Sequence, residues 1–88
     1  MKKSVKIEVQ EVEGEGLLAL LDKEVVVFCM NYIYSGKLSG VNTTDILLTD
    51  AVVVYETGTL TAVEFSDSQA LPNDLYIRTA SIESYYER

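Results

Sequence analysis

Residues 25–55 read VVVFCMNYIYSGKLSGVNTTDILLTDAVVVY, and this stretch decides the fold class. Residues 25–30 and 46–55 are almost continuously apolar, which is typical of strands that are buried on both faces. Residues 34–41 lie between these two runs and are predicted as the strand that connects them. The stretch therefore predicts consecutive β-strands joined by short turns.

Asparagine residues separate the predicted strands, and glycine residues mark a bend within one of them. Asn31 and Asn42 stand between the runs, where we expect turns because asparagine tolerates the left-handed backbone conformation. Gly36 and Gly40 share one face of the predicted strand 34–41, which is typical of a bend where two backbones approach closely. The strands alone fit a small barrel or a sandwich equally well, and the bend favours the barrel.

The flanking segments complete a mainly β chain with one short helix. Residues 5–9 alternate between apolar and polar side chains, which predicts an N-terminal strand. Leu17, Leu20 and Leu21 recur at the spacing of one or two helical turns. Further strands are predicted at residues 59–65, 75–77 and 82–86, with a loop over residues 66–74.

Length and composition bound the ways in which this fold can be stabilised. The 88 residues are expected to form a single domain, and a chain of this size buries only about 60% of its unfolded surface. Cys29 is the only cysteine, so no intrachain disulfide can form, and the absence of histidine leaves only carboxylates as metal ligands. We therefore expect association of subunits to stabilise the fold.

The same composition argues against catalysis. Without histidine there is no Ser–His or Cys–His pair, and no glycine-rich phosphate-binding motif is present. Residues 11–15 are acidic but lack the spacing of a calcium loop, so we expect a solvated turn. The sequence predicts a protein that is not an enzyme, with no catalytic residues, no metal and no cofactor.

The N-terminus predicts where the protein is found. Residues 1–8 lack the apolar core of a signal peptide, and no run of the sequence is long enough to span a bilayer. We expect a cytoplasmic protein with no membrane partner.

The formal net charge of −7 opposes nucleic-acid binding, because phosphates are usually bound by lysine and arginine. The acidic residues are unevenly distributed, however. Residues 25–48 carry only Lys37 and Asp45 as charged groups, so one surface can differ in sign from the whole chain.

In order along the chain, several motifs resemble those of the Sm-like (Sm/LSm) family, which includes the bacterial protein Hfq. The family has a leucine-bearing helix, a Val-x-Val strand, a strand with Gly-x-Leu, a loop Asp-x-x-Met-Asn leading into Leu-x-Leu, and a second motif Ile-Arg-Gly-x-Asn-Ile. The matching segments are residues 17–21, 25–27, 34–38, 42–51 with one loop residue deleted, and 75–82. The resemblance divides the single domain 1–88 into an N-terminal strand and turn (1–16), a first motif (17–56), a variable hairpin or loop (57–74) and a second motif (75–88).

The resemblance implies a strongly bent, five-stranded Sm-like (SH3-like) barrel with a short N-terminal helix and an extra N-terminal strand. Such subunits form homo-oligomeric rings, here of about five to seven copies. The strand near residues 75–77 would pair with the strand near 82–86 of a neighbour, which covers two exposed edges. The implied interface residues are Leu75, Tyr76, Ile77, Ile82 and Tyr85.

The resemblance also implies a nucleic-acid site in which Arg78 is the leading residue. Its forked guanidinium would bond bases or phosphates near the pore of the ring. The alternative is a local ion pair of Arg78 with Asp74 or Glu83. Thr79 stands where the family has glycine.

The remaining implied binding residues are Asn42, Thr44, Asp45 and Lys37. Asn42 and Asp45 reverse the family's Asp and Asn, and threonines replace the aromatic or histidine on which a base stacks. The alternative role for Asn42 and Asp45 is a turn in which their side chains bond the local backbone. Lys37 has the alternative role of an ordinary solvated strand residue.

Two functions follow. The leading hypothesis is a non-catalytic ring that binds single-stranded nucleic acid, either RNA or DNA, with RNA preferred, in RNA or DNA processing. The alternative is a structural or protein-interaction ring that keeps the Sm-like scaffold without nucleic-acid binding.

Overall fold

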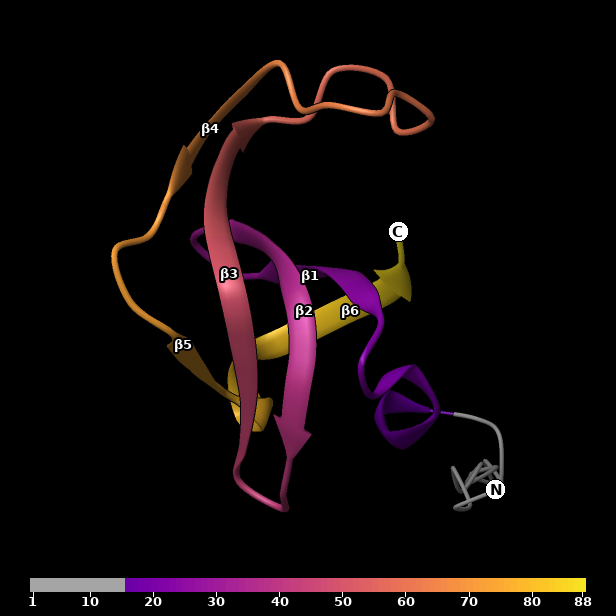
Figure 1. Cartoon of the computed structure of the whole chain (residues 1–88), viewed down its shortest axis with the longest axis vertical. Helices are drawn as coiled ribbons and strands as arrows, with labels where there is room; N and C mark the ends of the chain where they lie inside the picture. The colour runs from indigo at the N-terminus through magenta and orange to yellow at the C-terminus, as the bar shows by residue number, and fades with distance from the viewer. Residues whose placement is uncertain (1–15) are drawn as a thin grey trace, which may run out of the picture.

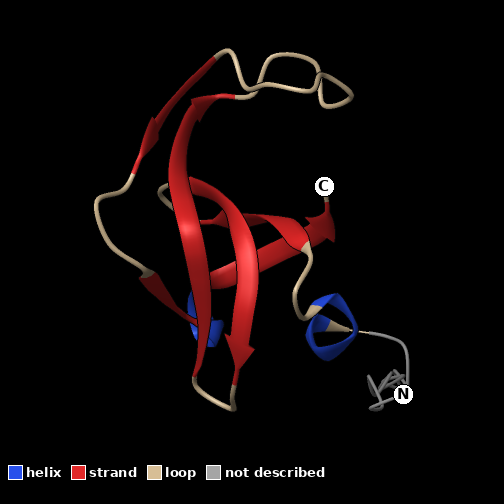
Figure 2. Ribbon diagram, viewed as in Figure 1, coloured by secondary structure: helices blue, strands red, loops and turns tan. Residues whose placement is uncertain are grey.

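The computed structural model describes residues 16–88 (Figures 1 and 2). The predicted strand at residues 5–9 and the acidic turn at 11–15 lie outside this range. The elements in chain order are η1 (Leu17–Leu20), β1 (Glu24–Cys29), β2 (Ile33–Val41), β3 (Asp45–Glu56), β4 (Asp67–Ala70), β5 (Leu75–Arg78), η2 (Thr79–Ser81) and β6 (Ile82–Glu87).

All six strands belong to one antiparallel sheet, which confirms the prediction of a mainly β chain. The order across the sheet is β4-β3-β2-β1-β6, and β5 also pairs with β3. The 12-residue β3 is long enough to take two partners in succession along one edge. Its first half pairs with β5 and its second half with β4, and Figure 1 shows the two short strands following the same side of β3.

The sheet is curved but does not close into a barrel. Strands β1 and β6 cross behind β2 and β3 at a steep angle in Figure 1. Within residues 16–88, β6 pairs with β1 and has no ladder to β4 or β5. The three-residue 3-10 turn η2 connects β5, at the β3 edge, to β6, at the β1 edge, so these two strands follow each other in the chain without pairing.

The bend expected at Gly36 coincides with an irregularity in the β2–β3 ladder. Ser35 pairs with Val52 and Lys37 with Thr49, so β3 carries an extra residue opposite Gly36. Asp50, in this bulge, has a left-handed backbone with φ 51°. A Cβ at Gly36 would lie 3.0 Å from the Thr49 carbonyl oxygen, so only glycine fits this close approach without a shift.

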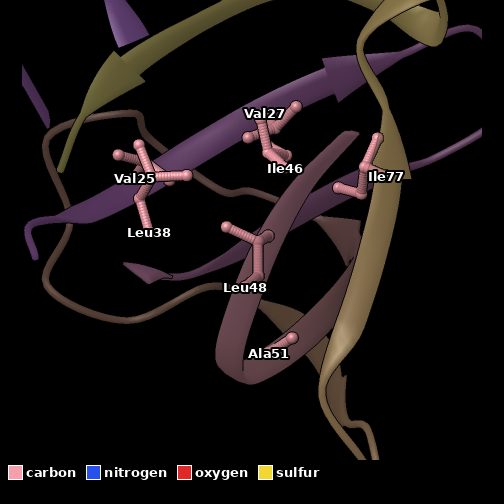
Figure 3. Packing of buried hydrophobic residues seen from close by; sticks show 7 residues of the cluster. All are labelled: Val25, Val27, Leu38, Ile46, Leu48, Ala51 and Ile77. Atoms are coloured by element: carbon pink, nitrogen blue, oxygen red, sulfur yellow. The ribbon is translucent and has the colours of Figure 1, made fainter. Parts of the chain in front are cut away.

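The core lies inside the curve of the sheet (Figure 3). The cluster drawn there takes side chains from β1, β2, β3 and β5: Val25, Val27, Leu38, Ile46, Leu48, Ala51 and Ile77. Val26, on the opposite face of β1, is also buried, as the continuous apolar run predicts. The one buried polar side chain among residues 16–88, Ser35, donates its hydroxyl to the Val25 carbonyl oxygen at 2.9 Å.

Three predicted elements differ from the structure: the N-terminal helix, the strand at residues 59–65, and the loop over residues 66–74, which contains β4. The predicted N-terminal helix is a single 3-10 turn of four residues, bounded by left-handed Gly16 and Asp22. The strand predicted at residues 59–65 is wrong, because the chain turns at Gly58 (φ 69°) and forms β4 only at Asp67. All four residues of β4 are exposed, so its pairing follows from the available edge of β3 and not from a buried apolar pattern.

Candidate functional site

The turn between β2 and β3 is built around the side chain of Asn42. Its Oδ1 accepts hydrogen bonds from the backbone N–H groups of Thr44 and Asp45, each at 2.8 Å. The Thr44 hydroxyl lies 3.1 Å from the same oxygen but closer, at 2.7 Å, to the Asp45 carboxylate, to which it donates its single proton. The Asn42 N–H donates to the Asp45 carbonyl oxygen at 3.0 Å and closes the turn. The structural role considered for Asn42 is therefore present, and its Nδ2 group is the part that can still donate to a ligand.

A second segment, far away in the sequence, holds this turn in place. The Thr79 N–H donates to the Thr44 carbonyl oxygen at 2.9 Å, and the Thr79 hydroxyl to the Thr43 carbonyl oxygen at 3.3 Å. The β3–β5 ladder sets Asp45 directly opposite Arg78. The fold thus brings together four of the five residues predicted to bind nucleic acid: Asn42, Thr44, Asp45 and Arg78.

Alternation along β5 sorts its side chains onto two faces. Ile77 is buried and Leu75 half-buried, whereas Tyr76 and Arg78 are exposed. Tyr76 is 69% exposed and lies opposite Leu47 of β3. The outer face at this end of the sheet therefore presents Arg78 beside Asp45 and Tyr76 beside Leu47.

A shallow hollow of about 230 Å³ lies on this outer face. It is lined by the end of β2, Asn42, the first residues of β3 and Tyr76. Its wall combines the apolar Leu47 with the polar ends of Asn42 and Asp45. This combination suits a flat ligand that has polar groups along its edge.

Lys37, the fifth predicted residue, does not belong to this group. It is an exposed residue of β2 that lies between Glu24 of β1 and Thr49 of β3 in the sheet. Four strand positions separate it from Val41, the last residue of β2, a distance of about 13 Å along an extended chain. The structure favours a solvated strand role for Lys37.

The predicted interface residues divide into core and surface. Ile77 is only 6% exposed and its side chain packs in the core, so that side chain is not available to a neighbour. Leu75, Ile82 and Tyr85 are half-buried and pack against the same core, and Tyr76 is exposed. Sequence alternation alone did not assign these faces, because the Leu-Tyr-Ile run is apolar on both.

The backbone edges of the strands are considered apart from the side chains, because pairing at an edge uses backbone groups. Among residues 16–88, β5 is paired along one edge with β3, and β6 along one edge with β1. A groove of about 590 Å³ runs between β5, η2, the start of β6 and the β1–β2 turn. Met30 and Tyr32 on that turn are exposed at 84% and 50%.

Cys29 and Tyr34 lie at the wall of this groove. Burial raises the pKa of the Cys29 thiol above its usual range, and the nearby Glu83 carboxylate raises it further. Burial is also the main cause of a raised pKa at Tyr34. Both groups are therefore held in their neutral forms, which agrees with an inert, packing role for Cys29.

A contact made by Arg88 at the C-terminus was not predicted from the sequence. The Arg88 guanidinium stacks 4.0 Å above the ring centre of Phe65 and donates a hydrogen bond to the Val63 carbonyl oxygen. The Arg88 N–H donates to the Glu24 carbonyl oxygen at 2.8 Å. The excursion between β3 and β4 is thereby attached to the end of β6.

The described part of the chain, residues 16–88, has neither a helix long and apolar enough to cross a membrane nor a group of three side chains placed to hold a metal ion. Comparison of the sequence with protein-family models and with curated proteins finds no match.

Proposed function

We propose that this chain is a diverged Sm-like protein that binds single-stranded nucleic acid, with RNA preferred, as a non-catalytic homo-oligomer. The observation that carries the proposal is the meeting of two distant segments at one end of the sheet. The turn at Asn42–Asp45 and the end of β5 at Arg78 are held together by Thr79. The Sm-like motifs imply that Arg78 contacts the ligand and that Asn42 and Asp45 shape its pocket, and this arrangement supports that interpretation.

The chemistry of these residues suits a strand of nucleotides. The planar guanidinium of Arg78 offers forked donors that match phosphate oxygens or the acceptor edge of a base. Asp45 accepts hydrogen bonds, so it favours the N–H edge of a base and repels phosphate. The site therefore needs the phosphates directed toward Arg78 and a base edge directed toward Asp45.

Assembly is the second part of the proposal. Within residues 16–88, β5 and β6 each have one edge that is not paired, and these edges would receive a neighbouring subunit. Pairing β5 of one copy with β6 of the next would extend the sheet from subunit to subunit. A ring of about five to seven copies would close the series and cover the free edges of β5 and β6.

Binding of a labelled single-stranded RNA at two salt concentrations tests the proposal. We expect the affinity to fall steeply with salt, and Arg78→Ala to weaken binding about tenfold, within the range for removal of one charged hydrogen-bonding group. Lys37→Ala is the matched control, because it removes the same charge from a site distant from the turn. A single-stranded DNA of the same sequence measures the preference for RNA.

Each outcome is informative. Loss of affinity in Arg78→Ala with little change in Lys37→Ala supports a site at the turn. Equal losses in both variants indicate attraction by overall charge and contradict the assigned site. No binding to the native protein at low salt contradicts the nucleic-acid function.

One observation favours the alternative of a structural ring without nucleic acid. The two donors of Thr44 are used within the turn: its N–H donates to Asn42 Oδ1 at 2.8 Å and its hydroxyl to the Asp45 carboxylate at 2.7 Å. The net charge of −7 also opposes phosphate binding. A stable oligomer that fails to bind RNA at low salt would establish this second function.

A further inference from the structure

We infer that Tyr76 is the stacking platform for a nucleobase of the bound strand. The base would occupy the hollow beside Leu47. This inference rests on the proposed function, and it assigns a base-stacking role to the surface where Tyr76 adjoins the Asn42–Asp45 turn. From the sequence, the tyrosines can be stacking platforms or packing and interface anchors, and Tyr76 was assigned to a subunit interface. Thr43 and Thr44 occupy the position where the Sm-like family has its stacking residue.

The exposure of Tyr76 is the first argument. Its side chain is 69% exposed although its strand neighbours Leu75 and Ile77 pack inward. An exposed tyrosine next to a hollow offers an aromatic face to a ligand without a cost of unpacking the core. Single-strand binders use such faces because every base can stack on them.

The surroundings of the hollow are the second argument. Leu47, directly opposite Tyr76, provides an apolar floor, and Gly40, opposite Leu47 on β2, has no side chain to fill the space. Asn42 and Asp45 line the same hollow and can bond the edge of a stacked base. The hollow therefore combines an aromatic face, an apolar floor and a polar rim.

The position of Arg78 is the third argument. It lies two residues from Tyr76 on the same exposed face of β5, about 7 Å along the strand. That spacing is close to the separation of successive phosphates on one strand of nucleic acid. A nucleotide stacked on Tyr76 can thus keep its phosphate within reach of the guanidinium.

A role for Tyr76 in stacking does not compete with assembly through β5. Pairing of a strand edge uses backbone N–H and C=O groups, whereas side chains stand roughly perpendicular to the sheet. Tyr76 and Arg78 also line the groove along the free edge of β5, so the two surfaces adjoin at these residues. The test therefore measures assembly and binding of each variant separately.

The test compares three variants in titrations with a labelled single-stranded RNA. Tyr76→Leu keeps an apolar side chain and removes the aromatic ring, and we expect about tenfold weaker binding. Tyr76→Phe keeps the ring and is expected to bind within about twofold of the native protein. Tyr55→Leu is the matched control, since Tyr55 is also exposed, at 52%, but lies ten residues beyond Asp45 on β3.

A second arm uses a strand of the same length that carries abasic sites. The native protein and Tyr76→Leu are expected to bind this strand equally, because no base remains to stack. Light scattering of each variant reports assembly in parallel. A change of mass in Tyr76→Leu would overturn the inference and return Tyr76 to the interface.

The remaining outcomes separate this inference from the proposed function. If Arg78→Ala weakens binding and Tyr76→Leu does not, the stacking role is wrong while the nucleic-acid function stands. If Tyr55→Leu loses as much affinity as Tyr76→Leu, the effect is not specific to the hollow and the inference fails. If the native protein binds neither strand, both proposals fail together.

Discussion

At the scale of single residues, Asn42 and Thr79 position the turn between β2 and β3 next to the end of β5. Asn42 accepts two backbone hydrogen bonds on one oxygen and fixes the turn, and Thr79 attaches that turn to the end of β5. The Thr79 hydroxyl reaches the Thr43 carbonyl oxygen, a contact that glycine at this position could not make.

Cys29 gives a prediction about reactivity. Its pKa is raised by burial first and by Glu83 second, so at pH 8 we expect iodoacetamide to alkylate the folded chain more slowly than the chain unfolded in urea. Glu83→Gln removes the second cause and should raise the rate, while leaving it below that of the unfolded chain. Mass spectrometry of timed samples measures both rates.

The raised pKa of Cys29 also makes the stability of the fold depend on pH. The folded chain binds the thiol proton more tightly than the unfolded chain, so this group favours folding below its ordinary pKa of 9.0. That contribution is lost as the pH rises through the higher pKa of the folded state. Equal alkylation rates for folded and unfolded chains at pH 8 would contradict the assignment.

At the scale of elements, the β2–β3 hairpin depends on one close approach. At Gly36→Ala the new Cβ would lie 3.0 Å from the Thr49 carbonyl oxygen and 3.1 Å from the Ala51 Cα, both backbone atoms that cannot move aside easily. We expect a loss of about 1–3 kcal/mol in the free energy of unfolding, measured by urea denaturation.

Gly40→Ala is the matched control for this prediction. It adds the same methyl group to the same strand, where the nearest atom is the Leu47 Cβ at 3.4 Å. We expect a much smaller loss than for Gly36→Ala. Equal effects of the two substitutions would show that general strand propensity, and not the bulge at Asp50, limits the hairpin.

The elements also show how far the sequence could be interpreted. β1, β2 and β3 were predictable because their apolar residues occupy the core, and burial imposes a pattern that can be recognised. β4 was not predictable, since Asp67-Ser68-Gln69-Ala70 has no buried face and pairs only because β3 extends beyond β5. The exposure of Tyr76 was not predictable either, because a run of three apolar residues does not show which of them points outward.

The candidate site was predictable in part for a similar reason. Motif order brought Asn42, Thr44, Asp45 and Arg78 into one hypothesis, and the β3–β5 ladder places them together. Lys37 belongs to the matched segment 34–38, but its place in the strand register separates it from the others. The register across the sheet, which decides which residues are neighbours, is not visible in the order of motifs.

At the scale of the whole molecule, the proposed assembly gives a direct prediction. Among residues 16–88 the core cluster contains seven buried apolar side chains, and Val26, Val53 and Val54 are buried outside it, which is a thin core. We expect light scattering at micromolar concentration to give a single mass of about five to seven chains. A stable monomer at that concentration would contradict the ring.

Within residues 16–88 the sheet has free edges at β4 and β5 on one side and at β6 on the other, and the proposed contact joins two different strands, β5 and β6. A contact between them is directional, so a dimer formed this way still presents one unused strand at each end, and growth does not stop at two copies. The rotation that relates one subunit to the next decides whether the row of subunits closes into a ring or continues as an open filament. The curvature set by Gly36 and the bulge at Asp50 would thereby govern not only the shape of one chain but also whether its polymer is finite.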